Sequence, residues 1–311
     1  MNLTTIVVGV DLSVPSEQAV DRAAALAQLH QAKLLLVHGQ ADDAPLDHPD
    51  NAMLEQLGEV SAAVRAEEAK RLGDRVAQLA GRGIDVELAT RTGAPGEVVA
   101  HIAAERHAEL IVVGTHGHTG ISRFLLGSVA TAILRHAPCD VLVCRGTPPG
   151  VPSPFLRPLV ATDFSPTSMR ALRNAADLTA PGVAIEVVHA WQLPAGSWGA
   201  TLLGQARFPW STVRDAVLSG AQAQADKLVA GHADLGHPLH VDLIQGPPAS
   251  VITHAAEKGG HDLIAIGTHG LKGFRRLLLG SVAEGVIRHA PCSVLVAHGE
   301  HAGETHKFKK T

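Results

Sequence analysis

Two stretches of the chain decide the fold, because one is nearly a copy of the other. Residues 114–143 read GTHGHTGISRFLLGSVATAILRHAPCDVLV, and residues 267–296 read GTHGLKGFRRLLLGSVAEGVIRHAPCSVLV. They are identical at 20 of 30 positions, at a constant offset of 153 residues. The more divergent residues 6–20 match residues 159–172 at nearly the same offset. A period near 150 residues is the size of a whole domain, so the sequence predicts two copies of one domain.

Prolines and glycines mark the boundary between the copies. Residues 146–154 hold four prolines and two glycines, a composition that favours an extended, non-helical linker. We therefore divide the chain into a first domain at 1–146, a linker at 147–154, a second domain at 155–299 and a polar tail at 300–311.

Composition bounds the class of protein. Hydrophobic residues make up 46% of the 311 residues and charged residues 18%, which provides for a buried core and argues against general disorder. A net charge of −4 and 3% aromatic residues argue against nucleic-acid binding and against a polybasic membrane-surface protein. Three cysteines cannot form a disulfide framework, and the N-terminus lacks a basic leader, so we expect a cytoplasmic protein.

Each copy alternates short apolar runs with helical patterns. In the first copy, strands are predicted at 5–10, 34–38, 84–89, 110–113 and 141–144, with helices near 14–30, 51–80, 96–107 and 128–136. The second copy repeats the order, with strands near Leu159, Val187, Val241, Ile264 and Leu295. Strands that alternate with helices imply right-handed crossovers and a parallel sheet covered on both faces. The predicted fold is α/β, with two tandem doubly wound parallel-sheet domains.

An acidic residue and a glycine-rich loop follow two strands of each copy. Asp11 and Asp163 end the first strand of their copies. The loop after the fourth strand has two glycines separated by two residues, then nine residues, then Gly-Ser. Ligands in doubly wound sheets bind beyond the carboxyl ends of the strands, where the strand order reverses. Both features are therefore predicted to border one ligand site per copy.

The glycine-rich loop has the chemistry of a phosphate cradle. Glycines such as Gly117 let main-chain N–H groups approach an anion, and residues 127–130 begin a helix whose first N–H groups favour phosphate. Ser128 either caps this helix or donates its hydroxyl to a phosphate oxygen, while Arg123 adds positive charge. A carboxylate such as Asp11 repels phosphate and suits a ribose hydroxyl. The carboxylate and the loop therefore divide the predicted site into a sugar end and a phosphate end. The alternative is that the glycine-rich loop is only a structural turn.

These motifs resemble the universal stress protein family, specifically its ATP-binding branch with tandem domains. The pattern Gly-x2-Gly-x9-Gly-(Ser/Thr) is complete in both copies. The block His-Ala-Pro-Cys-x-Val-Leu-Val, at 136–143 and 289–296, matches as well. The resemblance covers nearly all of residues 3–298 and implies the Rossmann-like fold of that family.

The resemblance also implies a ligand and a role. It implies ATP, with Mg²⁺ or Mn²⁺ at the phosphates, in one or both domains of a nucleotide-dependent stress-response regulator or sensor. The acidic residue contacts the nucleoside, the backbone after the second strand lies near the adenine, and the loop with its serine holds the phosphates. Single-domain members dimerise through their last strand, which implies an intramolecular pseudo-dimer, with a homodimer of the chain as a further option.

The candidate nucleotide-binding residues form two sets. The first comprises Gly9, Asp11, Val37, His38, Gly114, Thr115, His116, Gly117, Gly120, Arg123, Gly127, Ser128 and Val129. The second comprises Ala161, Asp163, Val188, Gly267, Thr268, His269, Gly270, Gly273, Gly280, Ser281 and Val282. His38 and its counterpart His189 either satisfy their nitrogens at the strand edge or contact the adenine. A methyl at Ala161, where the first copy has Gly9, is expected to narrow the approach to the ligand and favours the first site.

Three functions compete for these residues. The first is regulatory ATP binding, with an unknown protein partner; the second is slow ATP hydrolysis or adenylyl transfer; the third is a scaffold that binds no nucleotide. No Walker sequence and no His-x-Gly-His adenylyl-transfer motif occurs, so no catalytic residue is predicted and binding outranks chemistry. His118 does not recur in the second copy, which disfavours a dedicated metal site.

Overall fold

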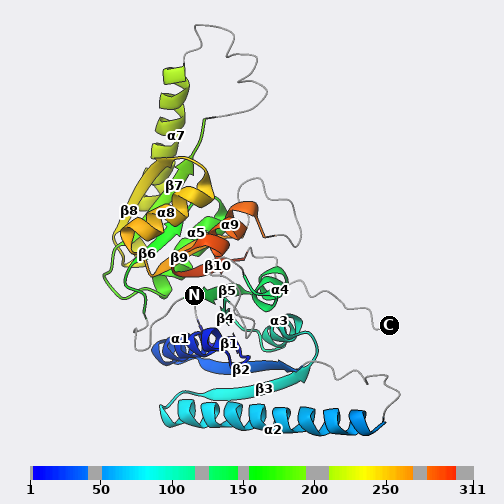
Figure 1. Cartoon of the computed structure of the whole chain (residues 1–311). Coiled ribbons are helices and arrows are strands. Elements are labelled where there is room, and N and C mark those ends of the chain that lie inside the picture. The colour runs from blue at the N-terminus through cyan, green and yellow to red at the C-terminus, as the bar shows by residue number, and fades with distance from the viewer. Residues whose placement is uncertain are drawn as a thin grey trace. The chain divides into compact units, whose positions relative to one another are not determined.

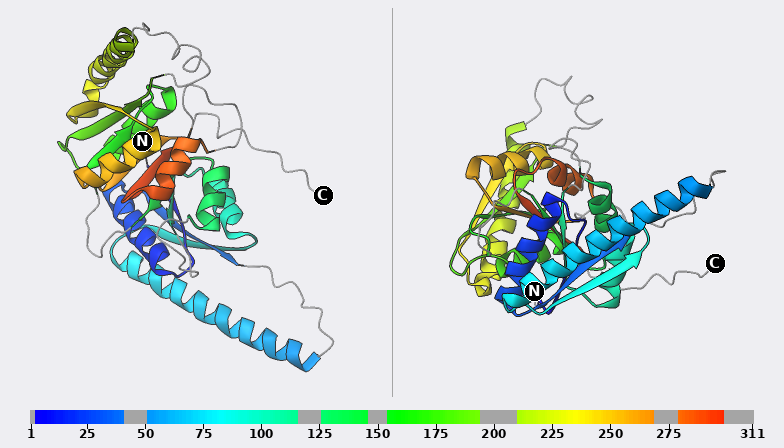
Figure 2. Two further views of the ribbon diagram at one scale, coloured as in Figure 1. Left: turned by 45° about the horizontal axis from the view of Figure 1, so that its top comes forward. Right: turned by 60° about the horizontal axis from the view of Figure 1, so that its bottom comes forward.

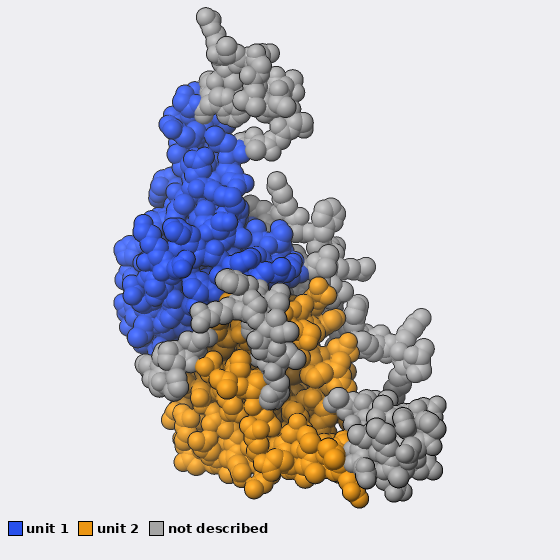
Figure 3. Space-filling model, in the orientation of Figure 1, with its two compact units in different colours: residues 1, 154–300 blue, residues 2–153, 301–311 orange. Residues whose placement is uncertain are grey.

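The computed structural model describes residues 3–40, 51–115, 126–145, 154–193, 210–268 and 279–298. The chain splits at residue 154 into two compact units, which Figure 3 shows in different colours. Each unit is described by itself below.

Both units are five-stranded parallel sheets with the same strand order (Figure 1). The first contains β1 (Thr5–Gly9), α1 (Val14–His30), β2 (Lys33–Gln40), α2 (Asn51–Gly81), β3 (Val86–Thr92), α3 (Pro95–Glu105), β4 (Leu110–Gly114), α4 (Ser128–His136) and β5 (Asp140–Cys144), in the order β3-β2-β1-β4-β5. The second contains β6 (Pro158–Ala161), α5 (Pro166–Asp177), β7 (Ile185–Trp191), α7 (Trp210–Gly231), the 3₁₀ turn η1 (Ala233–Leu235), β8 (Leu239–Gln245), α8 (Pro248–Gly259), β9 (Leu263–Gly267), α9 (Ser281–His289) and β10 (Ser293–Ala297), in the order β8-β7-β6-β9-β10. The predicted pair of doubly wound domains is confirmed.

The direction of the crossovers assigns each helix to a face of its sheet. From β1 the chain steps outward to β2 and β3, then returns past β1 to β4 and β5. Right-handed crossovers therefore place α1 and α2 on one face and α3 and α4 on the other (Figure 2). Ile6, Val7 and Val8 of β1 are fully buried between these layers. The strand order reverses between β1 and β4, so the loops after these two strands border the switch point.

The third predicted strand was placed wrongly. The apolar pattern predicted 84–89, whereas β3 runs Val86–Thr92. β3 is an edge strand whose register with β2 runs from Leu34 to Gln40, so it continues through exposed Arg91 to Thr92. The amide of Ile84 instead donates to the carbonyl of Leu79 at the end of α2. Main-chain pairing, rather than side-chain burial, sets the bounds of this strand.

Two carboxylates anchor the starts of the central strands. Glu109 accepts hydrogen bonds from the amides of Thr4 and Thr5, at 3.1 and 2.8 Å. In the second unit, Asp262 accepts hydrogen bonds from the amides of Leu156 and Arg157, at 2.8 and 2.9 Å. A carboxylate before β4 or β9 thus satisfies main-chain donors at the start of the neighbouring strand.

Small residues bring two helices of each unit close together. A Cβ on Gly96 of α3 would lie 2.6 Å from the Cβ of Ala132 on α4. In the second unit the pair is inverted: Ala249 stands on α8, and a Cβ on Gly285 of α9 would lie 2.9 Å from its methyl group. One methyl group fits at each helix crossing and two do not. The two copies therefore have the same total side-chain volume at this crossing, one alanine and one glycine, although the two residues stand on opposite helices.

We predict that Gly96→Ala destabilises the protein by about 1–3 kcal/mol, because the added methyl overpacks the α3–α4 crossing. Ala132→Gly alone is expected to cost about 1 kcal/mol through helix propensity. Urea unfolding should show the double variant to be more stable than the sum of the single effects, since together they reproduce the arrangement of the second unit. Strictly additive effects would contradict this packing.

Candidate functional site

The turn after β1 fixes the first candidate acidic residue. The amide of Ser13 donates to Asp11 Oδ1 at 3.0 Å, and the amide of Asp11 donates to Ser16 Oγ at 3.1 Å. Ser13 caps α1 by accepting the amide of Ser16, and Pro15 stands in the first turn of the helix. Between them Leu12 takes a left-handed conformation with φ 62°. The carboxylate is therefore oriented by a tight, strained turn.

The second unit repeats this turn with different side chains. The amide of Ser165 donates to Asp163 Oδ1 at 3.1 Å, and Ser165 accepts the amide of Ser168. Phe164 occupies the left-handed position, again with φ 62°. Each unit thus holds one carboxylate half-buried at the carboxyl end of its central strand.

The two histidines after the second strands are held by the main chain. His38 Nδ1 donates to the carbonyl of Val10 at 2.8 Å, and His189 Nδ1 donates to the carbonyl of Thr162 at 2.8 Å. This satisfies one ring nitrogen at the strand edge, which was one of the two alternatives. The preceding carbonyls, of Val37 and Val188, accept the amides of Val10 and Thr162 and so extend the sheet pairing to the turn.

A main-chain hydrogen bond closes each glycine-rich loop. The amide of Gly127 donates to the carbonyl of Thr115 at 2.8 Å, and the amide of Gly280 donates to that of Thr268 at 2.9 Å. Thr115 and Thr268 are buried. These two glycine amides thus close the loops, so contact with an anion depends on other donors, and the assignment of Gly127 and Gly280 as nucleotide-binding residues stays a prediction.

The donors available beside the loop are the first helical amides. In an α-helix the first N–H groups have no acceptor within the helix. In α4 these belong to Ser128, Val129 and Ala130, since the amide of Thr131 already donates to the carbonyl of Gly127. Ser281 and Val282 hold the same positions in α9. Ser128 and Ser281 are exposed. The remaining candidates lie outside the described residues: His116, Gly117, Gly120, Arg123, His269, Gly270 and Gly273.

The first glycine of each motif serves packing. A Cβ on Gly114 would lie 2.7 Å from the carbonyl oxygen of Pro15, and one on Gly267 would lie 3.0 Å from the side chain of Thr167. Glycine is needed here because the first turn of α1 or α5 passes over the end of the neighbouring strand. This approach brings the carboxylate turn beside the start of the glycine-rich loop.

The difference between Gly9 and Ala161 has a packing explanation. A Cβ on Gly9 would meet the side chains of Val99, at 3.4 Å, and Ile133, at 3.9 Å. It would therefore face the core and not a ligand, and the expected preference for the first site on this ground is wrong. At an offset of 153 residues, Val286 replaces Ile133 and lacks its terminal methyl group. The alanine and the shorter side chain compensate in volume.

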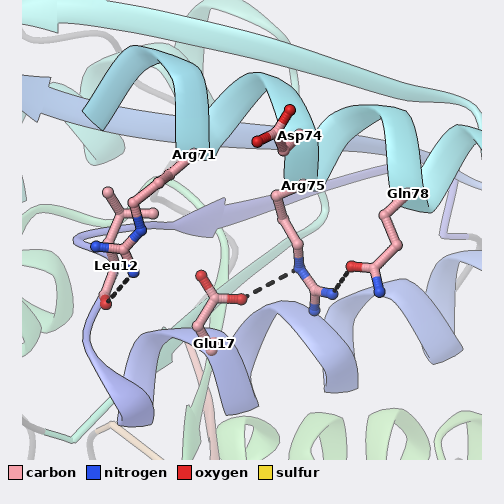
Figure 4. A pocket seen from close by; sticks show the side chains of 6 residues that line it. All are labelled: Leu12, Glu17, Arg71, Asp74, Arg75 and Gln78. Carbon is pink, nitrogen blue, oxygen red and sulfur yellow. Dashed lines mark hydrogen bonds and ion pairs between the residues drawn. The ribbon is translucent and has the colours of Figure 1, made fainter. Parts of the chain in front are cut away.

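A solvent-open hollow lies between α1 and α2 next to Leu12 (Figure 4). Arg71 of α2 extends toward the Leu12 carbonyl, with Nη2 3.5 Å from the oxygen. Arg75 pairs with Glu17, at 3.1 Å, and with Asp21 of α1. Neither arginine belongs to a sequence motif, and both lie more than 50 residues after the β1 turn along the chain.

The described residues contain no group of three or more His, Cys, Asp or Glu side chains placed to hold a metal ion. Nor does any helix within them combine the length and the apolar character needed to cross a membrane.

Comparison with known proteins places both units in one family. The model of the universal stress protein family matches residues 2–145 and again residues 155–298. The chain belongs to the universal stress protein family. A universal stress protein of Mycolicibacterium smegmatis is 30% identical over 300 residues, covering 94% of this chain and 96% of the relative. Universal stress protein Rv2005c of Mycobacterium tuberculosis is 30% identical over 304 residues, with the same coverage.

Solved structures agree on the fold. A universal stress protein from Archaeoglobus fulgidus superposes with a TM-score of 0.63 at 23% identity, covering 94% of this chain and 98% of that chain. A putative universal stress protein from Pseudomonas aeruginosa gives a TM-score of 0.60 at 20% identity, covering 95% and 93%. The tandem arrangement of two universal stress protein domains is therefore common to this chain and to full-length relatives.

We predict that Gly114→Ala destabilises the protein by about 2 kcal/mol, because the new methyl meets main-chain atoms that cannot rotate away. Gly267→Ala, which meets a threonine side chain, should cost less, about 1 kcal/mol. Chemical unfolding of both variants checks the order. Equal effects, or no effect of Gly114→Ala, would contradict the close approach of α1 to β4.

Proposed function

We propose that each universal stress protein domain binds ATP at its switch point. The observation that supports this best is the approach of Pro15 to Gly114, which sets the Asp11 turn beside the loop that leads to α4. One edge of the sheet thereby presents a carboxylate and a row of helical amides. These groups match the two ends of a nucleotide.

The carboxylate forms the nucleoside end. Asp11 and Asp163 accept hydrogen bonds from ribose hydroxyls, and the tight turns fix the direction of the acceptor oxygens. The nearby ends of β2 and β7, with His38 and His189, border the base. Because the Nδ1 atom of each histidine donates to the main chain, Nε2 is the ring nitrogen that remains for another partner.

The start of α4 or α9 forms the phosphate end. Amides of Ser128 and Val129, the exposed hydroxyl of Ser128 and the positive end of the helix dipole all favour an anion. The glycine-rich segment, including Gly117 or Gly270, completes the cradle. Mg²⁺ or Mn²⁺ would be held there mainly by the phosphate oxygens, since the described residues offer no cluster of metal ligands.

The function that follows is regulation by the bound nucleotide. The described site residues are acceptors and donors that hold a ligand, and catalysis needs a base or nucleophile in addition. We therefore propose a cytoplasmic stress-response protein whose ATP-bound conformation is recognised by a protein partner.

We predict that ATP with Mg²⁺ binds the full chain at two sites in titration calorimetry and that nucleotide appears in the heat-denatured supernatant. Gly117→Val and Gly270→Val should each remove one site, weakening it at least tenfold, because the side chain fills the cradle. The double variant should bind no ATP. Circular dichroism and unfolding of each variant provide the control for folding.

Other outcomes separate the alternatives. Absence of copurified nucleotide and of titration heat would favour the non-binding scaffold. Phosphate release that saturates with ATP and disappears in Asp11→Ala or Gly127→Ala protein would favour an enzyme. Turnover that survives both changes would indicate a contaminant.

A further inference from the structure

The two carboxylate turns are held by different means. In the second unit, Thr162 Oγ1 accepts the amide of Phe164 at 2.9 Å and lies 3.1 Å from Ser168 Oγ. The ring of Phe164 also packs on His189, with ring centroids 4.6 Å apart. These contacts come from the turn itself, from α5 and from the adjacent strand. The left-handed residue of this unit is therefore fixed locally.

The first unit lacks the threonine. Its counterpart is Val10, which has no hydroxyl, and Leu12 replaces the aromatic residue. A left-handed conformation of a non-glycine residue is strained and persists only when its surroundings hold it. In the first unit, helix α2 supplies a contact from outside the turn: the guanidinium of Arg71 donates to the carbonyl of Leu12 (Figure 4).

Helix α2 reaches the same region through two neighbouring side chains. Glu68 Oε2 lies 3.9 Å from His38 Nε2, and Arg75 pairs with Glu17 of α1. Glu68, Arg71 and Arg75 are spaced three and four residues apart, so they share one face of the helix. This face therefore contacts the end of β2, the β1 turn and the start of α1.

The described part of α7 makes no corresponding link. Its side-chain hydrogen bonds run within the helix, from Arg214 to Asp215 and from Gln222 to Asp226. The helix that follows the second strand is thus connected to the carboxylate turn in the first unit, whereas in the second unit the turn depends on Thr162.

We infer that Arg71 is a positioning residue for Asp11, so that nucleotide binding in the first domain is coupled to the docking of α2, while the second site is independent of α7. The inference rests on the proposed function for its ligand. Arg71 donates to the carbonyl of Leu12, the residue that follows Asp11. This contact fixes the turn and with it the direction of the Asp11 carboxylate that meets the ribose. By linkage, a nucleotide that requires this direction also stabilises the docked α2.

Full-length Gly270→Val protein reports the first site alone. In this background, Arg71→Ala should weaken ATP binding about threefold to tenfold, the fold-change that corresponds to the net contribution of one ordinary hydrogen bond. Amide hydrogen exchange of residues 10–17 should become faster without nucleotide. Arg214→Ala, the matched change on α7, should alter neither quantity, and the second site, measured in Gly117→Val protein, should be unaffected by Arg71→Ala.

Adding Val10→Thr to Arg71→Ala supplies the second unit's hydroxyl and should restore both affinity and exchange. Conversely, Thr162→Val should speed exchange of residues 162–169 and weaken only the second site. Wild-type affinity and exchange in Arg71→Ala protein would overturn the inference, as would a loss that Val10→Thr does not restore. If the parent chain binds no ATP, the proposed function fails, and exchange without nucleotide still decides whether Arg71 holds the turn.

Discussion

The close passage of the first turn of α1 over the end of β4 is the constraint on which the candidate site depends. Gly114 permits it, because any side chain there would meet the carbonyl of Pro15. The same contact recurs between Gly267 and Thr167. Without it the carboxylate turn and the glycine-rich loop would still share one edge of the sheet, but the first turn of α1 would stand further from the start of the loop. The first glycine of the motif is therefore needed for the packing that brings these two segments together.

The duplication makes each domain a reference for the other. At the crossing of two helices, one difference between the copies compensates another in side-chain volume. Gly96 faces Ala132 in the first unit, and Ala249 faces Gly285 in the second. The turns also differ: a threonine hydroxyl accepts the amide of the left-handed residue in the second unit, and an arginine of α2 donates to the carbonyl of that residue in the first. The differences in the core preserve volume, whereas the difference at the turn changes which elements supply its hydrogen bonds.

Loop closure redistributes the donors near the proposed phosphate end. The amides of Gly127 and Gly280 are used to join the two ends of their loops, which fixes where α4 and α9 begin. The loop closure thus sets the position of the helix start, and the amides of the next residues lie in the first turn of that helix. This arrangement explains why a Gly-Ser pair stands at the end of the motif: glycine closes the loop and serine begins the helix.

The sequence by itself determined the duplicated doubly wound fold, the helix beginning at Ser128 and the placement of Asp11 and Asp163 at strand ends. These depend on apolar runs, caps and repeats, which are local properties of the chain. Tertiary structure alone decided the bounds of the edge strand β3, the packing roles of Gly9 and Gly114, and the contact of Arg71 with Leu12. Each of these depends on atoms from elements far apart in the sequence, and no local pattern records which distant side chain will occupy a given space.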